Sequence, residues 1–212
     1  MKTVTNVVWL LSLISLLGCQ TELKTEAAYF RWLNQAENGL VQVVEKKGTV
    51  LKAKFLPSTY LAYKEIQSLP ATTSFDSLHQ QYDQDLTFTI SIEITEGNPM
   101  YKGVSDYADY QERVNVLNFS ADQHIYLKSK GKIYYPTLHT FENTYNVSQK
   151  KLLYVVFNKT QGTQDILKAE EVTLVFDDKI FNTGKASFNF KTADLTHIPT
   201  VTLIEKLRKD EK

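Results

Sequence analysis

The strongest constraint on the fold is a run of ten residues, 86–95, in which apolar and polar side chains alternate without interruption. Apolar residues occupy every second position from Leu86 to Ile94, and threonine, serine or glutamate occupies the positions between them. Because successive side chains of a β-strand point to opposite faces of a sheet, this period of two predicts a strand. We expect a half-buried strand, with its apolar face on a core and its polar face in solvent.

A β-hairpin is predicted upstream of this strand. Residues 40–44 and 49–55 are rich in β-branched and apolar side chains, and the short segment between them ends in Gly48. Two such runs around a glycine-bearing turn are typical of a hairpin.

Helices are predicted in four places. Residues 27–33 carry clustered aromatic side chains, which indicate a short helix or a first docking segment. Apolar residues recur every three or four positions in residues 57–66 and again in residues 75–82, with Pro70 between the two stretches. The same spacing in residues 107–117 predicts a helix that covers one face or edge of the sheet.

The second half of the chain, from His124 onward, shows the pattern of short strands. Strands at this spacing favour a sandwich. The predicted class is therefore a β-rich α+β fold, with an antiparallel β-sandwich and short helices in the N-terminal half. The predicted C-terminal strands cover residues 125–127, 133–135, 152–157, 172–176 and 186–190.

Three of these runs carry a family resemblance. Residues 153–157, 172–176 and 187–190 lie within the segment 150–199, which resembles the C-terminal strands of Ig-like domains found in bacterial lipoproteins. The resemblance implies an Ig-like sandwich. It carries over no catalytic residue, because this fold hosts many unrelated functions.

The composition indicates one globular domain. Of the 212 residues, 42% are hydrophobic, and a chain of this size can bury a core without disulfide or metal staples. Lysine plus arginine and aspartate plus glutamate both number 24, so the formal charge is balanced. This balance argues against nucleic acid as a partner, because such proteins present a basic face to phosphates.

The first 18 residues have the pattern of a secretory signal peptide. Lys2 supplies a positive start, residues 7–17 form an apolar run, and the small residue Gly18 follows. A helix needs roughly 20 residues to cross a hydrocarbon core of about 30 Å, so this run is too short to span a membrane. We therefore predict a signal peptide over residues 1–18.

The apolar run leads into the single cysteine of the chain, in the sequence Leu16-Leu17-Gly18-Cys19. These four residues resemble the lipobox of Gram-negative bacterial lipoproteins. The resemblance implies that Cys19 carries diacylglycerol, that the leader is cut before Cys19, and that the new amine is acylated. Several acyl chains give stable attachment, so the membrane becomes a partner through the lipid anchor. The alternatives are an ordinary leader with a chance cysteine and a frayed membrane anchor.

The residues after Cys19 bear on location and domain boundaries. The lipoprotein resemblance favours the outer membrane, because Gln20 stands where many inner-membrane lipoproteins carry aspartate, and the periplasmic side, because no dense acidic run follows. Residues 19–28 are predicted to be a lipidated tether, residues 29–200 a single β-rich domain, and residues 201–212 a charged tail.

No catalytic motif is present in the sequence. A Gly-x-Ser-x-Gly serine motif, a phosphate-binding glycine loop and a His-Glu-x-x-His zinc motif are all absent. None of the four histidines has a second histidine or cysteine at metal-ligand spacing. We therefore predict no catalytic, cofactor-binding or metal-binding residue from motifs. The histidines are His79, His124, His139 and His197.

Clustered carboxylates are the remaining candidates for chemistry. Such groups could hold calcium, or act as the acid and base of a hydrolase if they face each other across a cleft. Aspartate is also a normal turn residue, so solvated surface is the simpler interpretation. The clusters are Asp83 with Asp85, Asp106 with Asp109 and Glu112, and Asp177 with Asp178.

Tyrosine is abundant, with 12 residues, and exposed tyrosines make adaptable binding surfaces. Tyrosine also suits half-buried strand positions, which is the simpler interpretation. The tyrosines in question are Tyr101, Tyr107, Tyr110, Tyr126, Tyr134, Tyr135 and Tyr145.

These observations favour a non-catalytic binding or scaffolding module of the cell envelope, with an envelope protein or glycan as its partner and no cofactor. The first alternative is an envelope hydrolase that acts on glycan or peptide through carboxylates brought together by folding. The second is a carrier or chaperone of apolar cargo, which would enclose an apolar cavity.

Overall fold

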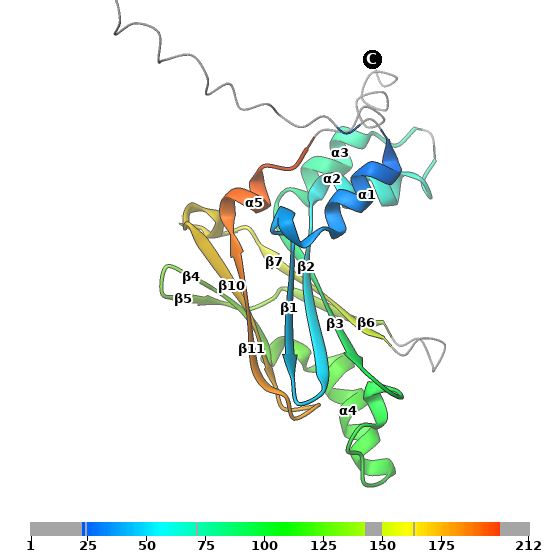
Figure 1. Ribbon diagram of the computed structural model, residues 1–212. Helices are drawn as coiled ribbons and strands as arrows, with labels where there is room; N and C mark the ends of the chain where they lie inside the picture. Colours follow the sequence, from blue (N-terminus) through cyan, green and yellow to red (C-terminus); the bar gives the residue numbers. More distant parts are fainter. Residues whose placement is uncertain (1–22, 24, 71, 143–149, 163, 200–212) are drawn as a thin grey trace, which may run out of the picture.

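The computed structural model describes residues 23, 25–70, 72–142, 150–162 and 164–199 of the chain. Within these residues, two larger antiparallel sheets and five α-helices make up most of the fold (Figure 1). The predicted β-rich α+β class is therefore confirmed.

The first sheet has five strands in the order β1-β2-β3-β7-β6, and all neighbouring strands run antiparallel. It joins strands from both halves of the chain, so the N-terminal half supplies more than helices. Its central strand, β3, is the strand predicted from the alternating run. The strands are β1 (Val41–Lys46), β2 (Thr49–Leu56), β3 (Asp85–Ile94), β6 (Leu138–Glu142) and β7 (Lys151–Asn158).

Strands β1 and β2 form the predicted hairpin, in which Lys46 pairs with Thr49. The two turn residues, Lys47 and Gly48, have φ angles of 51° and 67°. A two-residue type I′ turn requires positive φ at both positions, and its twist matches that of the strands it joins. Gly48 adopts this conformation without a steric penalty, which explains why glycine ends the turn.

The second sheet has four strands in the order β11-β10-β4-β5, again antiparallel. The predicted C-terminal strands are confirmed in both sheets. A separate two-stranded ribbon, β8-β9, lies between β7 and β10 in the sequence. The strands are β4 (Ile125–Ser129), β5 (Lys132–Tyr134), β8 (Thr160–Gln161), β9 (Gln164–Asp165), β10 (Glu171–Asp178) and β11 (Gly184–Lys191).

The helices divide between two ends of the molecule (Figure 1). Helices α1, α2, α3 and α5 lie at one end, and α4 lies at the other, where it contacts the edge strand β6. The four predicted helices are confirmed, whereas α5 was not predicted. The helices are α1 (Glu26–Asn34), α2 (Ser58–Ile66), α3 (Phe75–Tyr82), α4 (Tyr107–Phe119) and α5 (Thr192–Thr196).

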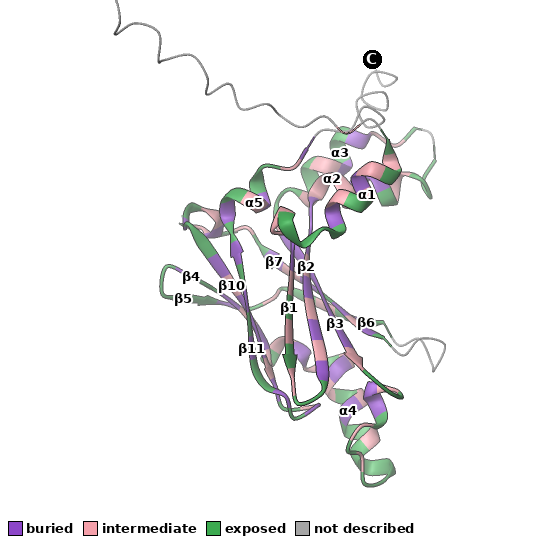
Figure 2. Ribbon diagram, viewed as in Figure 1, coloured by how far each residue is buried: buried purple, intermediate pink, exposed green. Residues whose placement is uncertain are grey.

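The apolar faces of the two sheets contribute to one hydrophobic core (Figure 2). Phe88 of β3 is fully buried, and its ring lies 5.3 Å from that of Phe55, 6.1 Å from that of Phe157 and 5.2 Å from that of Phe190. The first two partners belong to the same sheet as Phe88, and Phe190 belongs to β11 of the other sheet. Burial of these aromatic side chains removes a large apolar area from water and thus holds the sheets together.

The expectation that β3 is half-buried was wrong. The hydroxyl residues Thr87, Thr89 and Ser91, which alternate with its apolar residues, are buried as well. The reason is the central position of β3, because Thr89 lies in register between Lys54 of β2 and Tyr154 of β7. Long side chains on both neighbouring strands cover the short hydroxyl residues between them.

Strands β6, β8 and β9 were also missed by the sequence interpretation. Only Phe141 is buried in β6, and β8 and β9 have two residues each, so none has a run of alternating apolar side chains. The predicted signal peptide, Cys19, Tyr145 and the tail 201–212 lie outside the described residues. In the described part of the chain, no helix is long and apolar enough to cross a membrane.

Candidate functional site

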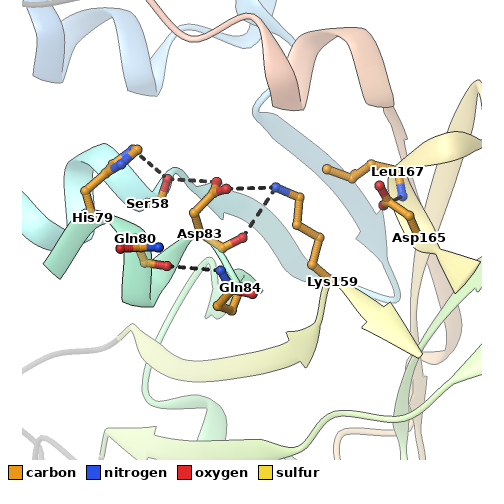
Figure 3. Close-up of polar contacts among 8 residues, drawn as sticks. All are labelled: Ser58, His79, Gln80, Asp83, Gln84, Lys159, Asp165 and Leu167. Atoms are coloured by element: carbon orange, nitrogen blue, oxygen red, sulfur yellow. Dashed lines mark hydrogen bonds and ion pairs between the residues drawn. The ribbon is translucent and has the colours of Figure 1, made fainter. Parts of the chain in front are cut away.

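A cleft of about 310 Å³ opens at the end of the molecule that carries α2, α3 and α5. We call it the Ser58 cleft, after the residue at the centre of its polar network (Figure 3). Its polar wall contains Ser58, His79, Asp83, Asp85 and Lys159. The two carboxylates are the first pair predicted from the sequence, and folding places both in one cleft.

Local structure explains how each polar residue reaches the cleft. Pro57 precedes α2 in an extended conformation, so Ser58 stands at the start of that helix. His79 lies on α3, and Asp83 follows the end of α3. Asp85 is the first residue of β3, and Lys159 follows β7, which pairs with β3. The cleft is therefore built where two helices meet the ends of two central strands.

The polar side chains form a connected network (Figure 3). The Ser58 hydroxyl lies 3.2 Å from Nε2 of His79 and donates to Oδ1 of Asp83 over 3.4 Å. The ammonium group of Lys159 lies 3.2 Å from Oδ2 of Asp83 and 3.3 Å from its carbonyl oxygen. The His79 ring also stacks on that of Phe75, with centroids 6.1 Å apart. Lys159 and Ser58 therefore both hold the Asp83 carboxylate.

The order of these contacts differs from that of a serine hydrolase. In a catalytic triad, the histidine accepts the serine proton and the carboxylate orients the histidine. Here the carboxylate of Asp83 contacts Ser58 itself. A hydroxyl has a single proton, so when Ser58 donates to Asp83, Nε2 of His79 must be the donor to Ser58. In this arrangement His79 does not act as the base for Ser58.

The two carboxylates of the cleft have different surroundings. Asp83 is exposed and paired with Lys159. Asp85 is half-buried, and burial raises the pKa of its carboxyl group above the usual value. Asp85 is therefore the carboxyl group of this cleft that holds a proton more readily than an ordinary aspartate, as the acid of an acid–base pair must.

The second predicted carboxylate cluster, Asp106 with Asp109 and Glu112, serves mainly to cap α4. Oδ1 of Asp106 accepts from the backbone N–H of Asp109 over 3.0 Å, and Oδ2 of Asp109 accepts from that of Ser105 over 3.0 Å. Carboxylates at a helix start satisfy N–H groups that have no partner within the helix. Asp109 and Glu112 are exposed and line a hollow of about 410 Å³ beside α4.

A buried arginine forms the floor of this hollow. The guanidinium of Arg113 donates to the carbonyl groups of Pro99, Met100 and Lys102, and it lies 5.0 Å from the centre of the Phe181 ring. Burial lowers the pKa of Arg113. All of these contacts join α4 to neighbouring segments, so Arg113 stabilises the fold at this end.

The two residues of the third predicted carboxylate cluster, Asp177 and Asp178, lie in different environments. Asp177 is half-buried and lies 3.7 Å from Lys185, whereas Asp178 is buried. The expected solvated position of Asp178 was therefore wrong. Its carboxylate accepts from the backbone N–H groups of Ile180, Phe181 and Thr183, each over 2.8 Å. These bonds organise the β10–β11 connection, because they pair N–H groups that the strands leave unsatisfied.

Each of the four histidines has its own contacts in the described structure. His79 lines the Ser58 cleft, His124 lines the hollow beside α4, and His139 lies 3.7 Å from Asp122. Nδ1 of His197 lies 2.7 Å from the Ala193 carbonyl. Among the described residues, no group of three or more histidine, cysteine, aspartate or glutamate side chains is arranged to hold a metal ion.

An exposed aromatic surface lies at the α4 end. The rings of Tyr101 and Tyr110 stack with centroids 5.2 Å apart and an interplanar angle of 11°, and Tyr107 lies 6.4 Å from Tyr110 at 25°. Tyr101 is 51% exposed and Tyr107 is 72% exposed. We call these three residues the tyrosine stack. Tyr134, by contrast, is buried, so only some of the tyrosines named from the sequence lie at the surface.

The sequence interpretation did not identify Ser58 or Lys159 as site residues. Lys159 is 76 positions from Asp83 along the chain, and Ser58 is 21 positions from His79. Neither separation forms a recognisable motif. Only the pairing of β3 with β7 and the packing of α2 against α3 bring these side chains together.

Comparison with known proteins adds little to this description. No protein-family model and no curated protein matches the chain. A solved structure that matches is that of a protein of unknown function from Burkholderia pseudomallei K96243, at 11% sequence identity. The match covers 86% of this chain and 89% of the other, with a TM-score of 0.38. The function is therefore inferred from the residues of this chain.

Proposed function

We propose that the chain is a lipid-anchored binding module of the outer membrane, on the periplasmic side, whose tyrosine stack contacts a protein partner in the envelope. The observation that carries this proposal is the exposure of parallel tyrosine rings at the α4 end. Tyrosine supplies a large, rigid contact area with a polar tip, and it is enriched at protein interfaces. A protein partner is therefore favoured over a glycan.

The position of the stack supports the same proposal. Helix α1 begins at Glu26, seven residues after the predicted lipidation site Cys19, and it lies at the opposite end of the molecule from α4 (Figure 1). A lipid at Cys19 would therefore attach the end that carries α1. The tyrosine stack would then face away from the bilayer, where an envelope partner can reach it.

We also propose that the two antiparallel sheets form an Ig-like sandwich. Support comes from the shared core, in which Phe88 of one sheet contacts Phe190 of the other. An experimental structure tests this proposal through the packing angle and the connections of the sheets. Ig-like packing aligns the two sheets at about 30°.

The anchor is tested by mass spectrometry and membrane fractionation of the wild type and the variant Cys19→Ala. We expect acyl groups on Cys19 of the wild type, and release of the variant from the membrane. A wild type without acyl groups, recovered outside the membrane fraction, would refute the lipoprotein assignment.

The partner surface is tested by a photo-cross-linking residue at position 107 in living cells. We expect the residue at position 107 to cross-link to one discrete protein. The additional substitution Tyr101→Ala should lower the yield of this cross-linked product. The matched control places the same residue at Ile133, which is 49% exposed on the edge strand β5. Equal cross-linking from both positions would count against the tyrosine stack as the partner surface. If position 107 cross-links to a glycan alone, the partner is a glycan and the proposed protein partner is refuted.

A second candidate, an envelope hydrolase acting on glycan or peptide, has one observation in its favour. Asp83 and Asp85 line the same cleft, and burial raises the pKa of Asp85. Incubation with purified peptidoglycan, followed by mass spectrometry of released fragments, tests this activity. Asp85→Asn should abolish release and Glu112→Gln should preserve it. A wild type that releases nothing eliminates this candidate.

The carrier of apolar cargo receives less support. The Ser58 cleft and the hollow beside α4 both carry charged side chains, among them Lys159 in the first and Arg113 in the second. Charged walls do not suit apolar cargo, because such cargo would remove water from the charged groups, and this desolvation costs free energy.

A further inference from the structure

A groove, distinct from the Ser58 cleft and from the hollow beside α4, lies on the face of the five-stranded sheet that points away from the shared core. It has a volume of about 360 Å³ and is closed on one side by residues of α1 and α2. Side chains from β2, β3 and β7 form its floor in two rows across the sheet. Lys52, Ser91 and Leu152 share one register row, and Lys54, Thr89 and Tyr154 share the next.

Four lysines line this groove, which we call the lysine groove. Lys52 and Lys54 come from β2, Lys64 comes from α2, and Lys150 immediately precedes β7. Among the described residues, none of the lining side chains is a carboxylate. Glu93 lies near Lys150 and Ser91, 3.5 Å from the Lys150 ammonium group. Within the described structure, Lys52, Lys54 and Lys64 form no ion pair.

Lys54 occupies the most constrained position of the four. Its ammonium group donates to Oδ1 of Asn34 over 2.8 Å and lies 5.7 Å from the centre of the Tyr60 ring. Burial, and then the positive charges of Lys52 and Lys150, lower the pKa of Lys54 to about 8. Like charges held together in a partly buried site repel each other, and a bound anion would relieve that repulsion.

Other side chains that line the lysine groove suit an anion as well. Lys64 and Tyr60 approach from α2, and Tyr154 approaches from β7. Burial raises the pKa of both Tyr60 and Tyr154, with a further contribution to Tyr154 from Glu142, so both hydroxyls remain donors at neutral pH. Thr89 and Ser91 are buried residues of the floor, and the Ser91 hydroxyl donates to Glu93.

We propose that the lysine groove binds a phosphate-bearing ligand. A phosphate group carries more negative charge than a carboxylate and has three acceptor oxygens, which match several ammonium and hydroxyl donors. The volume of 360 Å³ lies within the range of about 300–1,000 Å³ that is typical of small-molecule sites. Leu56, Leu61 and Leu152 supply an apolar wall for the carbon part of the ligand. This site is separate from both the tyrosine stack and the Ser58 cleft.

The test uses the full chain labelled with ¹³C-lysine, titrated with pyrophosphate and monitored by the Lys54 Cε resonance. We expect saturable binding and an upward shift of the Lys54 pKa, because the anion favours the charged ammonium group. Lys54→Gln should weaken binding by about tenfold or more. This variant removes a repulsive charge and should fold. The control Lys128→Gln, on an exposed position of β4, should bind as the wild type does.

Two further probes identify the source of the phosphate. Glycerol 3-phosphate represents a free phosphate ester, and a short-chain dihexanoyl phosphatidic acid represents a lipid headgroup. Tighter binding of the second, dependent on Lys54, assigns a phospholipid; equal binding assigns a free phosphate ester. The proposal is overturned if none of the phosphates binds, if Lys54→Gln binds pyrophosphate as the wild type does, or if sulfate binds equally well.

Discussion

The ring of Phe88 on β3 lies 5.2 Å from the ring of Phe190 on β11, at an interplanar angle of 53°. These residues are 102 positions apart and belong to different sheets. Their contact, together with those to Phe55 and Phe157, places an aromatic cluster where the two sheets share their core. The relative position of the sheets therefore depends on this cluster.

Phe88→Ala should lower the free energy of unfolding by about 3–5 kcal/mol, because truncation of a buried aromatic ring leaves a cavity. Urea denaturation followed by circular dichroism measures the loss. Phe119→Ala is the matched control, since Phe119 is 77% exposed and its change should stay within about 0.5 kcal/mol. Similar losses in the two variants would show that Phe88 has no special place in the core.

Asp178→Ala should destabilise the protein by about 3 kcal/mol or more, because it leaves three backbone N–H groups without their acceptor. Asp177→Ala is the neighbouring control. Its carboxylate lies 3.7 Å from Lys185 in a partly exposed pair, and such a contact is worth less than about 1 kcal/mol. Amide hydrogen exchange should locate the lost protection in residues 179–183 for the first variant alone. Unchanged protection there would contradict the role assigned to Asp178.

Gly39→Ala should cost clearly more stability than Gly131→Ala. The two glycines have nearly the same positive φ, 74° and 75°, so each substitution carries a similar backbone penalty of about 1 kcal/mol. A methyl group on Gly39 would also collide with the Asp194 carboxylate and lie 2.8 Å from its Cβ, whereas a methyl group on Gly131 meets nothing within 4 Å. Thermal unfolding compares the two. Equal melting temperatures would mean that α5, which carries Asp194, moves aside freely.

The free energy of unfolding should rise as the pH increases from about 8 towards 10. The folded-state pKa of Lys54 is about 8, against 10.5 for an ordinary lysine, so the unfolded chain binds more protons in this window. Lys54→Met should therefore be more stable than the wild type at neutral pH, and its stability should rise less with pH.

Urea denaturation of both proteins, from neutral pH to about pH 9.5, measures this difference. The upper limit avoids the tyrosines, because burial and a hydrogen bond to Glu65 raise the pKa of Tyr82 to about 12. The unfolded chain loses that proton above its ordinary pKa of 10.0, which lowers stability at higher pH. Parallel pH profiles for the wild type and Lys54→Met would exclude the proposed charge repulsion.

Several elements could be predicted from local sequence. The alternation in residues 86–95 predicts β3, and the β-prone runs around Gly48 predict the β1–β2 hairpin. The spacing of apolar residues predicts α2, α3 and α4. In each case the signal lies within one continuous stretch of the chain, because side-chain periodicity and turn conformation are properties of a few consecutive residues.

The burial of Thr89 and Asp178 could not be predicted in this way. Both are polar residues at positions that normally face solvent, and their burial depends on neighbours from other strands and on the loop that folds over Asp178. The two carboxylate candidates of the Ser58 cleft were named from the sequence, but their partner Lys159 was not.

The sequence by itself determined many of the local elements, the balanced charge and the resemblance of its leader to a lipoprotein signal. Tertiary structure alone decided which distant side chains meet: Ser58 with His79 and Asp83, and Lys54 with Lys52 and Lys150. The physical reason is that charge repulsion, hydrogen bonding and burial depend on distance in space. Strand order and helix packing set that distance, and they are properties of the whole chain.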